Sequence, residues 1–137
     1  MHRLSEDYNV HISHDNKPVK GDWNGAGMHT NFSTNEMRDA DTGAAAIETS
    51  ISRLEAKHKE HITHYGAGLE DRLTGQHETS TIHEFSAGAA NRGSSIRIPG
   101  PVALKGYGYI EDRRPGANAD PYMVAALIMS TICDIKM

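Results

Sequence analysis

The segment from Gly21 to Asn31 combines residue types that let a backbone approach a ligand with one that binds metals. It reads Gly-Asp-Trp-Asn-Gly-Ala-Gly-Met-His-Thr-Asn, and three of its first seven residues are glycine. Glycine has no Cβ and adopts positive φ without strain, so this loop can come close to a ligand. His29 follows and offers an imidazole to a metal ion. The segment matches neither a P-loop nor the G-x-G-x-x-G spacing, and an ordinary turn is the alternative explanation for the glycines.

Two later segments set charged side chains beside turns. Arg72 and Glu78 flank one glycine turn with a cation and a carboxylate. Arg92 and Arg97 are five residues apart, an odd spacing that points them to opposite faces of a strand unless a bulge intervenes. Gly93 is a natural position for that bulge.

A third segment, residues 109–115, places a carboxylate and an arginine on one strand face, because Glu111 and Arg113 are two residues apart. Taken singly, each charged segment is explained by surface ion pairing. Taken together, they favour an anion site, because arginine binds carboxylates and phosphates through paired hydrogen bonds. A carboxylate beside an imidazole suits a divalent metal ion. Phosphoryl transfer to or from an acidic substrate requires that mixture.

The histidines at positions 58, 61 and 64 form an H-x-x-H-x-x-H run that resembles a zinc motif. On a helix, however, the first and third lie about 120° apart around the axis, so the three cannot converge on one ion. No Cys-x-x-Cys or His-Glu-x-x-His companion occurs in the chain. We therefore expect these histidines to pack against the helix's neighbours or to lie on the surface.

Short elements must position these groups. The segment from Val10 to His14 predicts a strand just before the glycine loop. A helix is predicted from Asp41 or Thr42 to about Tyr65, where Gly66 supplies a stop signal. Its packed stripe is predicted to consist of Ile47, Ile51, Leu54, His58, His61, Ile62 and Tyr65.

The second half of the chain predicts strands followed by one helix. Between Leu73 and Tyr109 we expect short strands joined by loops, including one over Ser94–Ile98. Asp120 before Pro121 is a strong helix-start signal, and the last helix is predicted to continue to about Cys133.

Composition limits the classes of protein. With 137 residues, of which 37% are hydrophobic and 6% aromatic, the chain is one domain at most with a thin core. The formal net charge of −4 argues against nucleic acid or an acidic membrane as the main partner. One cysteine excludes an internal disulfide.

The first residues do not form a signal peptide, and the longest apolar run is too short to span a bilayer. We expect a soluble cytoplasmic protein, with an organelle as the alternative.

Residues 17–33 resemble the Lys-Pro-x-x-Gly-x-Trp-Asn-Gly-Ala-Gly-x-His-Thr-Asn-x-Ser segment of eukaryotic-type glutamine synthetases. The resemblance extends from Leu4 to about Ile128, because further motifs follow in the family's order at similar spacing. These motifs are Arg72-Leu-Thr-Gly75, His77-Glu-Thr79, Ala90-Asn-Arg92, Ser95-Ile-Arg97 and Glu111-Asp-Arg-Arg-Pro115.

The resemblance implies an α+β fold of antiparallel strands with flanking helices, incomplete in this chain. Residues 1–137 would be the carboxy-terminal part of the catalytic domain. The family's amino-terminal β-grasp domain, and the first half of its catalytic domain with further metal-binding glutamates, have no counterpart in the sequence. The family joins glutamate to ammonia with ATP through γ-glutamyl phosphate, uses Mg²⁺ or Mn²⁺, and assembles as two stacked rings of identical subunits. We therefore expect little or no activity from this chain alone.

The resemblance also implies a role for each matching residue. His29 and Glu111 correspond to metal ligands, and Arg92 corresponds to the residue that neutralises charge on the transferred phosphoryl group. Glu78 corresponds to the flap carboxylate that shapes the ammonium site and shields the intermediate from water. Glutamate would be held by Trp23, Asn24, Gly25, Arg72 and Arg113. The nucleotide would be bound by Asn31, Phe32, Ser33, Arg92, Arg97 and Tyr109.

Three classes of function remain open at this point. The first is a piece of an ATP-dependent ligase, with the family's chemistry by descent. The second is a non-catalytic relative that keeps the pocket for binding or assembly. The third is a small fold unrelated in activity, which the order of the motifs disfavours.

Overall fold

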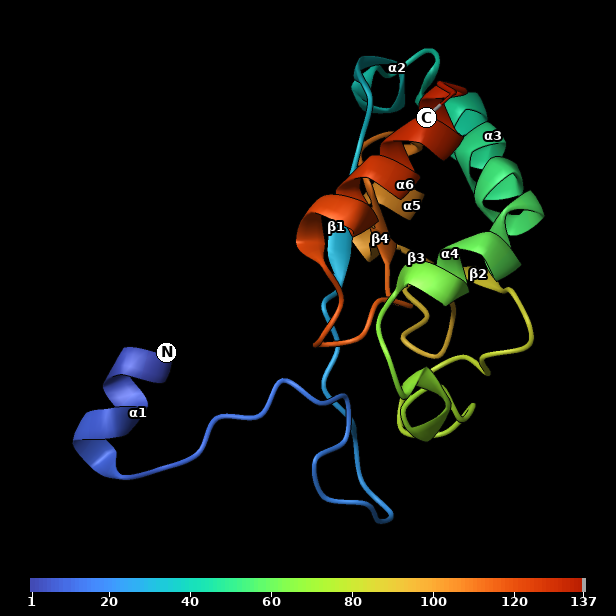
Figure 1. The fold of residues 1–137 in the computed structure, drawn as a ribbon. Helices are drawn as coiled ribbons and strands as arrows, with labels where there is room; N and C mark the ends of the chain where they lie inside the picture. The colour runs from blue at the N-terminus through green and yellow to red at the C-terminus, as the bar shows by residue number, and fades with distance from the viewer. Residues whose placement is uncertain (137) are drawn as a thin grey trace.

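A four-stranded sheet with helices packed on one of its faces forms the body of the protein (Figure 1). The computed structural model describes residues 1–136. In chain order the elements are α1 (His2–Tyr8), β1 (Thr30–Phe32), α2 (Asn35–Arg38), α3 (Gly43–Ala56), α4 (His58–His64), the 3₁₀ helix η1 (Leu69–Asp71), β2 (Ala87–Ala89), β3 (Ile96–Ile98), α5 (Gly100–Lys105), β4 (Ile110–Asp112) and α6 (Pro121–Cys133).

The sheet has the strand order β1-β4-β3-β2 and is mixed. β4 pairs antiparallel with both β1 and β3, as expected. The expectation of a wholly antiparallel sheet is wrong, because β2 pairs parallel with β3. A positive φ of 53° at Ala90 helps the chain double back after β2. Parallel strands usually need a long crossover connection. Because β2 and β3 are only three residues long, the short segment between them is enough to join them.

The two faces of the sheet differ in chemistry. Ile96 and Ile110 point inward and are buried in one apolar cluster with Leu54 of α3 and Val124 of α6. Alternation along each strand then turns the intervening residues outward. Three of these outward residues share one row, because Glu111 is the register partner of both Asn31 and Arg97.

The sequence predicted the packed faces of the helices better than it predicted their ends. The stripe predicted for residues 47–65 is buried or half-buried throughout. The single helix predicted from residue 41 or 42 to 65 is wrong, because the chain breaks at Lys57 into α3 and α4. No glycine or proline accounts for that break. Thr42 does not cap α3 with its side chain; the Asp39 carboxylate accepts the Thr42 amide hydrogen bond instead.

The last helix is confirmed, with the Asp120 carboxylate accepting from the Tyr122 backbone N–H at 2.9 Å. The strand predicted over 94–98 forms at 96–98, but Gly93 lies in a turn and makes no bulge. α5 was not predicted; its first turn contains Pro101, which suits a helix start. Among residues 1–136 no helix is both long and apolar enough to cross a membrane.

The first 15 residues form an arm apart from the body (Figure 1). The strand predicted from Val10 to His14 does not form, and Val10 is 58% exposed. An extended segment needs a neighbouring strand to satisfy its backbone groups, and no strand of residues 1–136 pairs with this one. Apolar residues line a hollow of about 380 Å³ on the arm itself; they include Leu4, Tyr8, Val10 and Ile12.

Behind the sheet lies a buried charged network. Arg114 is fully buried and donates to the Asp112 carboxylate through Nε at 2.9 Å and Nη2 at 2.7 Å. The Tyr65 hydroxyl donates to the same carboxylate at 2.8 Å. His58 and His61 of α4 contact the guanidinium with their Nδ1 atoms. The expectation that these histidines pack against the helix's neighbours agrees with this arrangement, because they join α4 to Arg114 just after β4.

The first prediction concerns the buried ion pair. Replacing Asp112 with Asn leaves the Arg114 charge buried without its counter-ion, so the free energy of unfolding should fall by about 3–5 kcal/mol in chemical denaturation. The matched control is Glu60→Gln, which removes an exposed partner of Lys57 and should cost less than about 1 kcal/mol. An equal loss of unfolding free energy in the two variants would contradict the claim that the buried Asp112–Arg114 pair stabilises the fold.

The second prediction concerns pH. Burial, followed by the charge of Arg114, lowers the pKa of His61 to about 4. The unfolded chain, with an ordinary pKa of 6.5, therefore binds a proton that the folded chain does not. The free energy of unfolding should be greatest above pH 6.5 and fall toward pH 4, by up to about 1.4 kcal/mol per pH unit for this group. His61→Gln should flatten that slope by about one proton.

Candidate functional site

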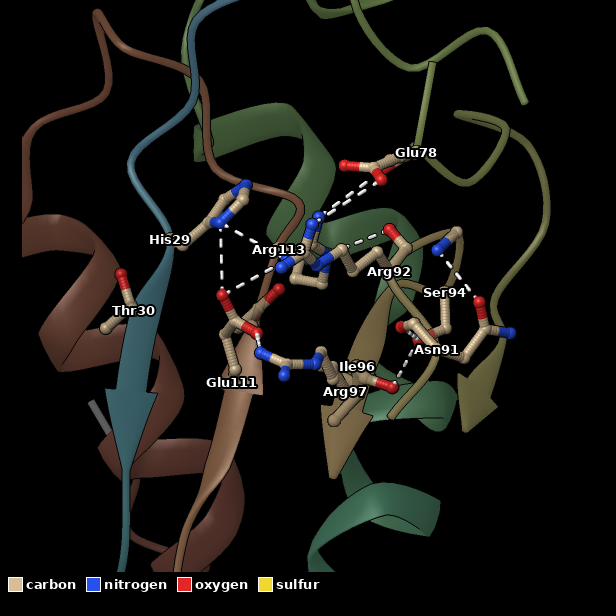
Figure 2. Close-up of polar contacts among 12 residues, drawn as sticks. His29, Thr30, Glu78, Asn91, Arg92, Ser94, Ile96, Arg97, Glu111 and Arg113 are labelled. Atoms are coloured by element: carbon tan, nitrogen blue, oxygen red, sulfur yellow. Dashed lines mark hydrogen bonds and ion pairs between the residues drawn. The ribbon is translucent and has the colours of Figure 1, made fainter. Parts of the chain in front are cut away.

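The outward face of the sheet carries a cluster of charged side chains centred on Glu111 (Figure 2). The carboxylate accepts from Arg97 Nη1 at 2.9 Å through Oε2, and from Arg113 Nη1 at 3.2 Å through Oε1. His29 Nδ1 lies 3.1 Å from the same Oε1. Burial alone would raise the pKa of Glu111, but the hydrogen bond from Arg97 and the charge of Arg113 hold it below its usual value. Glu111 is therefore ionised at neutral pH.

Arg113 connects this carboxylate to two loops. Its Nε donates to the Arg92 carbonyl at 3.0 Å, and its Nη2 donates to the Glu78 carbonyl at 3.3 Å. The side chains of Arg92 and Glu78 then face each other, with Nη1 and Oε1 3.6 Å apart (Figure 2). Glu78 has a positive φ of 60°, a strained conformation for a residue with a side chain. The Arg113 bonds hold this strained segment over the sheet.

Arg72 lies beneath the histidine. It is 5% exposed, and its guanidinium donates to the carbonyls of Arg113 at 2.9 Å and Arg114 at 3.2 Å. Its Nη2 also lies 3.1 Å from His29 Nε2. Burial, and then the charges of Arg113 and Arg72, lowers the pKa of His29 below 6.5, so the imidazole is neutral at pH 7.

The glycines of residues 21–31 allow this close approach. A Cβ on Gly27 would overlap the Arg72 guanidinium, and one on Gly25 would lie 2.8 Å from the Asn16 carbonyl oxygen. Asn16 anchors the loop, since its carbonyl accepts from the Ala26 N–H at 2.7 Å. Gly25 and Gly27 are therefore needed because the loop packs directly against a buried arginine. An ordinary turn would not require glycine for this reason.

Two shallow hollows contain other residues of the predicted sites. One, of about 300 Å³, contains Trp23, Asn24 and Gly25, three of the five residues assigned to glutamate by resemblance. The other, of about 230 Å³, is lined by Asn31, Phe32, Ser33 and Tyr109, which were assigned to the nucleotide. Part of each predicted set therefore lines a concave surface, whereas Arg72 and Arg113 line neither hollow. Arg97 belongs to the Glu111 cluster, and Arg92 lies at its rim, 64% exposed at the side chain.

The spacing of two of these side chains matches that of two ligands of a divalent cation, but two ligands do not complete its coordination shell. Neighbouring donors of an octahedral magnesium ion are about 3 Å apart, and His29 Nδ1 and Glu111 Oε1 are separated by 3.1 Å. Within residues 1–136, however, no group of three or more His, Cys, Asp or Glu side chains is arranged to hold a metal. Other donors would have to come from substrate, water or protein outside this sequence.

Sequence reasoning gave no role to Arg114, although its motif was noted. The signal was available, because alternation along β4 sends Arg114 to the opposite face from Arg113. An arginine on the inner face of a sheet must be paired with a buried carboxylate, which Asp112 provides.

The chain is similar to curated fungal proteins named glutamine synthetase. It is 57% identical to the protein of Neurospora crassa over 131 residues, which are 96% of this chain and 36% of that relative. It is 57% identical to the protein of Emericella nidulans and 54% identical to that of Saccharomyces cerevisiae, each over 97% of this chain. The chain spans about a third of the length of these relatives. No protein-family model matches it.

The third prediction tests the role of Arg113 as the link to the Glu78 segment. Arg113→Lys keeps the charge but cannot bond the Arg92 and Glu78 carbonyls together, so amide hydrogen exchange over residues 76–80 should accelerate at least about tenfold. Arg38→Lys, which alters an exposed arginine bonded to Ser33 and Asn35, is the control and should leave these amides unchanged. Unaltered exchange in Arg113→Lys would show that other contacts hold the segment.

Proposed function

The chain belongs to the eukaryotic-type glutamine synthetase family, and we propose that it supplies the carboxylate- and phosphate-binding part of an ATP-dependent glutamate–ammonia ligase. In this proposal residues 1–137 are the carboxy-terminal part of the catalytic domain. Glutamate, ammonia and ATP are the substrates, and catalysis depends on protein outside this sequence. Assembly into stacked rings is proposed on the family's precedent.

One observation carries the proposal. The Arg97 Nε atom is buried and has no hydrogen-bond partner among the described residues, although its Nη1 is bonded to Glu111. A buried, unsatisfied donor on a cation costs free energy unless an acceptor arrives, and a phosphate oxygen is such an acceptor. Arg113 shares the Glu111 carboxylate with Arg97, and Arg92 lies at the rim of the same cluster, which adds to the attraction for an anion.

The chain's residues would act on two successive steps. In the first, a side-chain carboxylate oxygen of glutamate forms a bond to the γ-phosphorus of ATP and ADP departs; in the second, ammonia attacks the acyl carbon and phosphate leaves. Arg92 and Arg97 would offset charge on the transferred phosphoryl group, and Glu78 would help to keep water from the intermediate. Arg72 and Arg113, with Trp23, Asn24 and Gly25, would hold glutamate. His29 and Glu111 would ligate Mg²⁺ or Mn²⁺, which when bound offsets phosphate charge.

A non-catalytic binding protein is the second candidate, and one observation favours it. The described residues offer only His29 and Glu111 as metal ligands at the site, whereas each cation needs about six donors. A chain that works alone would then hold nucleotide or glutamate without turning them over.

The fourth prediction tests the ligase directly. The experiment is a chimera in which residues 4–128 replace the matching segment of the Saccharomyces cerevisiae relative, which is 54% identical. This chimera should synthesise glutamine from glutamate, ammonia and ATP. The measurement is phosphate release coupled to glutamine formation. Retention of at least about a tenth of the parent's activity is expected, because this family's motifs are preserved in order.

The matched control is the same chimera with Arg113→Met, which should lose more than about 100-fold in activity because both the glutamate site and the Glu78 segment depend on this guanidinium. A folded chimera that binds ATP but makes no glutamine would favour the non-catalytic alternative. Equal activity with and without Arg113 would contradict the assigned site.

A further inference from the structure

The His29 ring has no lone pair free for a metal in this structure. A neutral imidazole carries one N–H and one lone pair. Arg72 can only donate, so His29 Nε2, at 3.1 Å from Arg72 Nη2, must be the accepting nitrogen. The proton then sits on Nδ1 and is donated to Glu111 Oε1 at 3.1 Å.

The remaining neighbours are consistent with this tautomer. Arg113 Nη1 lies 3.4 Å from Nδ1, but both are donors, and the acceptor for Arg113 is the Glu111 oxygen at 3.2 Å. Arg72 is held by its bonds to two backbone carbonyls, and it packs so closely on Gly27 that a Cβ there would overlap the guanidinium. The Nδ1–H tautomer is therefore imposed by the fold.

We infer that Arg72 occupies the metal-ligating lone pair of His29, so that a divalent cation and Arg72 compete for this one ring. A cation at Nε2 would displace Arg72 directly. A cation at Nδ1, between the ring and Glu111, would move the ring proton to Nε2, where it would face an Arg72 N–H. Either position breaks the Arg72–His29 hydrogen bond.

This inference rests on the proposed metal role of His29 and adds a consequence to it. The Arg72 N–H that no longer bonds to His29 becomes available to another acceptor. The carboxylate of an acidic substrate is an acceptor that suits a guanidinium. Metal binding would thus prepare Arg72 for substrate. Arg72 is a positioning residue in the metal-free chain and a carboxylate ligand after metal binds.

The test uses the full ¹⁵N-labelled chain and its ring nitrogens at pH 7.5. Long-range ¹H–¹⁵N spectra, assigned with a His29→Gln variant, should show the Nδ1–H tautomer for His29. In Arg72→Met, which keeps an apolar stem against Gly25, the ring should keep its Nδ1–H bond to Glu111 while the Nε2 lone pair becomes free. Mn²⁺ affinity, measured by electron paramagnetic resonance of free Mn²⁺, should rise at least about tenfold because a charge-assisted hydrogen bond no longer competes.

The matched control is Arg92→Met, which removes an equal charge from the same face without touching His29. It should leave the tautomer unchanged and alter Mn²⁺ affinity less than about threefold. An Nε2–H tautomer in the unsubstituted chain would overturn the inference, and so would equal gains in Mn²⁺ affinity from the two substitutions. Absence of Mn²⁺ binding in every variant, with the Nδ1–H tautomer present in the unsubstituted chain, would overturn the proposed metal role instead.

Discussion

The structure depends on four consecutive charged residues that are buried at the end of β4 and directly after it. Glu111, Asp112, Arg113 and Arg114 are 8%, 2%, 9% and 0% exposed. Buried charges are tolerated only when they are paired and hydrogen-bonded, and alternation along the strand separates these four into two pairs. Asp112 and Arg114 pair on the inner face, where Arg114 contacts His61 of α4, which in turn is hydrogen-bonded to Thr131 of α6. Glu111 and Arg113 pair on the outer face, where they form the centre of the candidate site.

The inner pair therefore sets the position of the outer one. Because Asp112 is held by Arg114 and Tyr65, the strand cannot slide or rotate without breaking buried bonds, and Glu111 keeps its place between Arg97 and His29. The outer face holds more arginines than carboxylates. Converging cations repel one another unless an anion joins them, so this face is prepared for phosphate or carboxylate groups. The pairing of buried charges in residues 111–114 thus underlies both the fold and the proposed chemistry.

Part of the arrangement was predictable because its signals are local. The two-residue spacing of Glu111 and Arg113 placed them on one face, and the Asp120-Pro121 start of α6 was read correctly. The Val10–His14 strand was wrong because strand formation depends on a pairing partner elsewhere in the chain. Likewise, the break at Lys57 and the parallel pairing of β2 reflect tertiary contacts that periodicity does not record. The partners of Arg72 also depend on segments more than 40 residues away along the chain.

The central claim is that the outer face of the sheet is the ligand-binding surface. Chemical-shift mapping of the ¹⁵N-labelled chain with magnesium and ATP tests it most directly. The account predicts that the amides perturbed most belong to residues 31–33, 97 and 109–113, with little change in α1 or in the hollow of about 530 Å³ between α3, α4 and the end of α6. Perturbation confined to that hollow, or to the amino-terminal arm, would contradict the account.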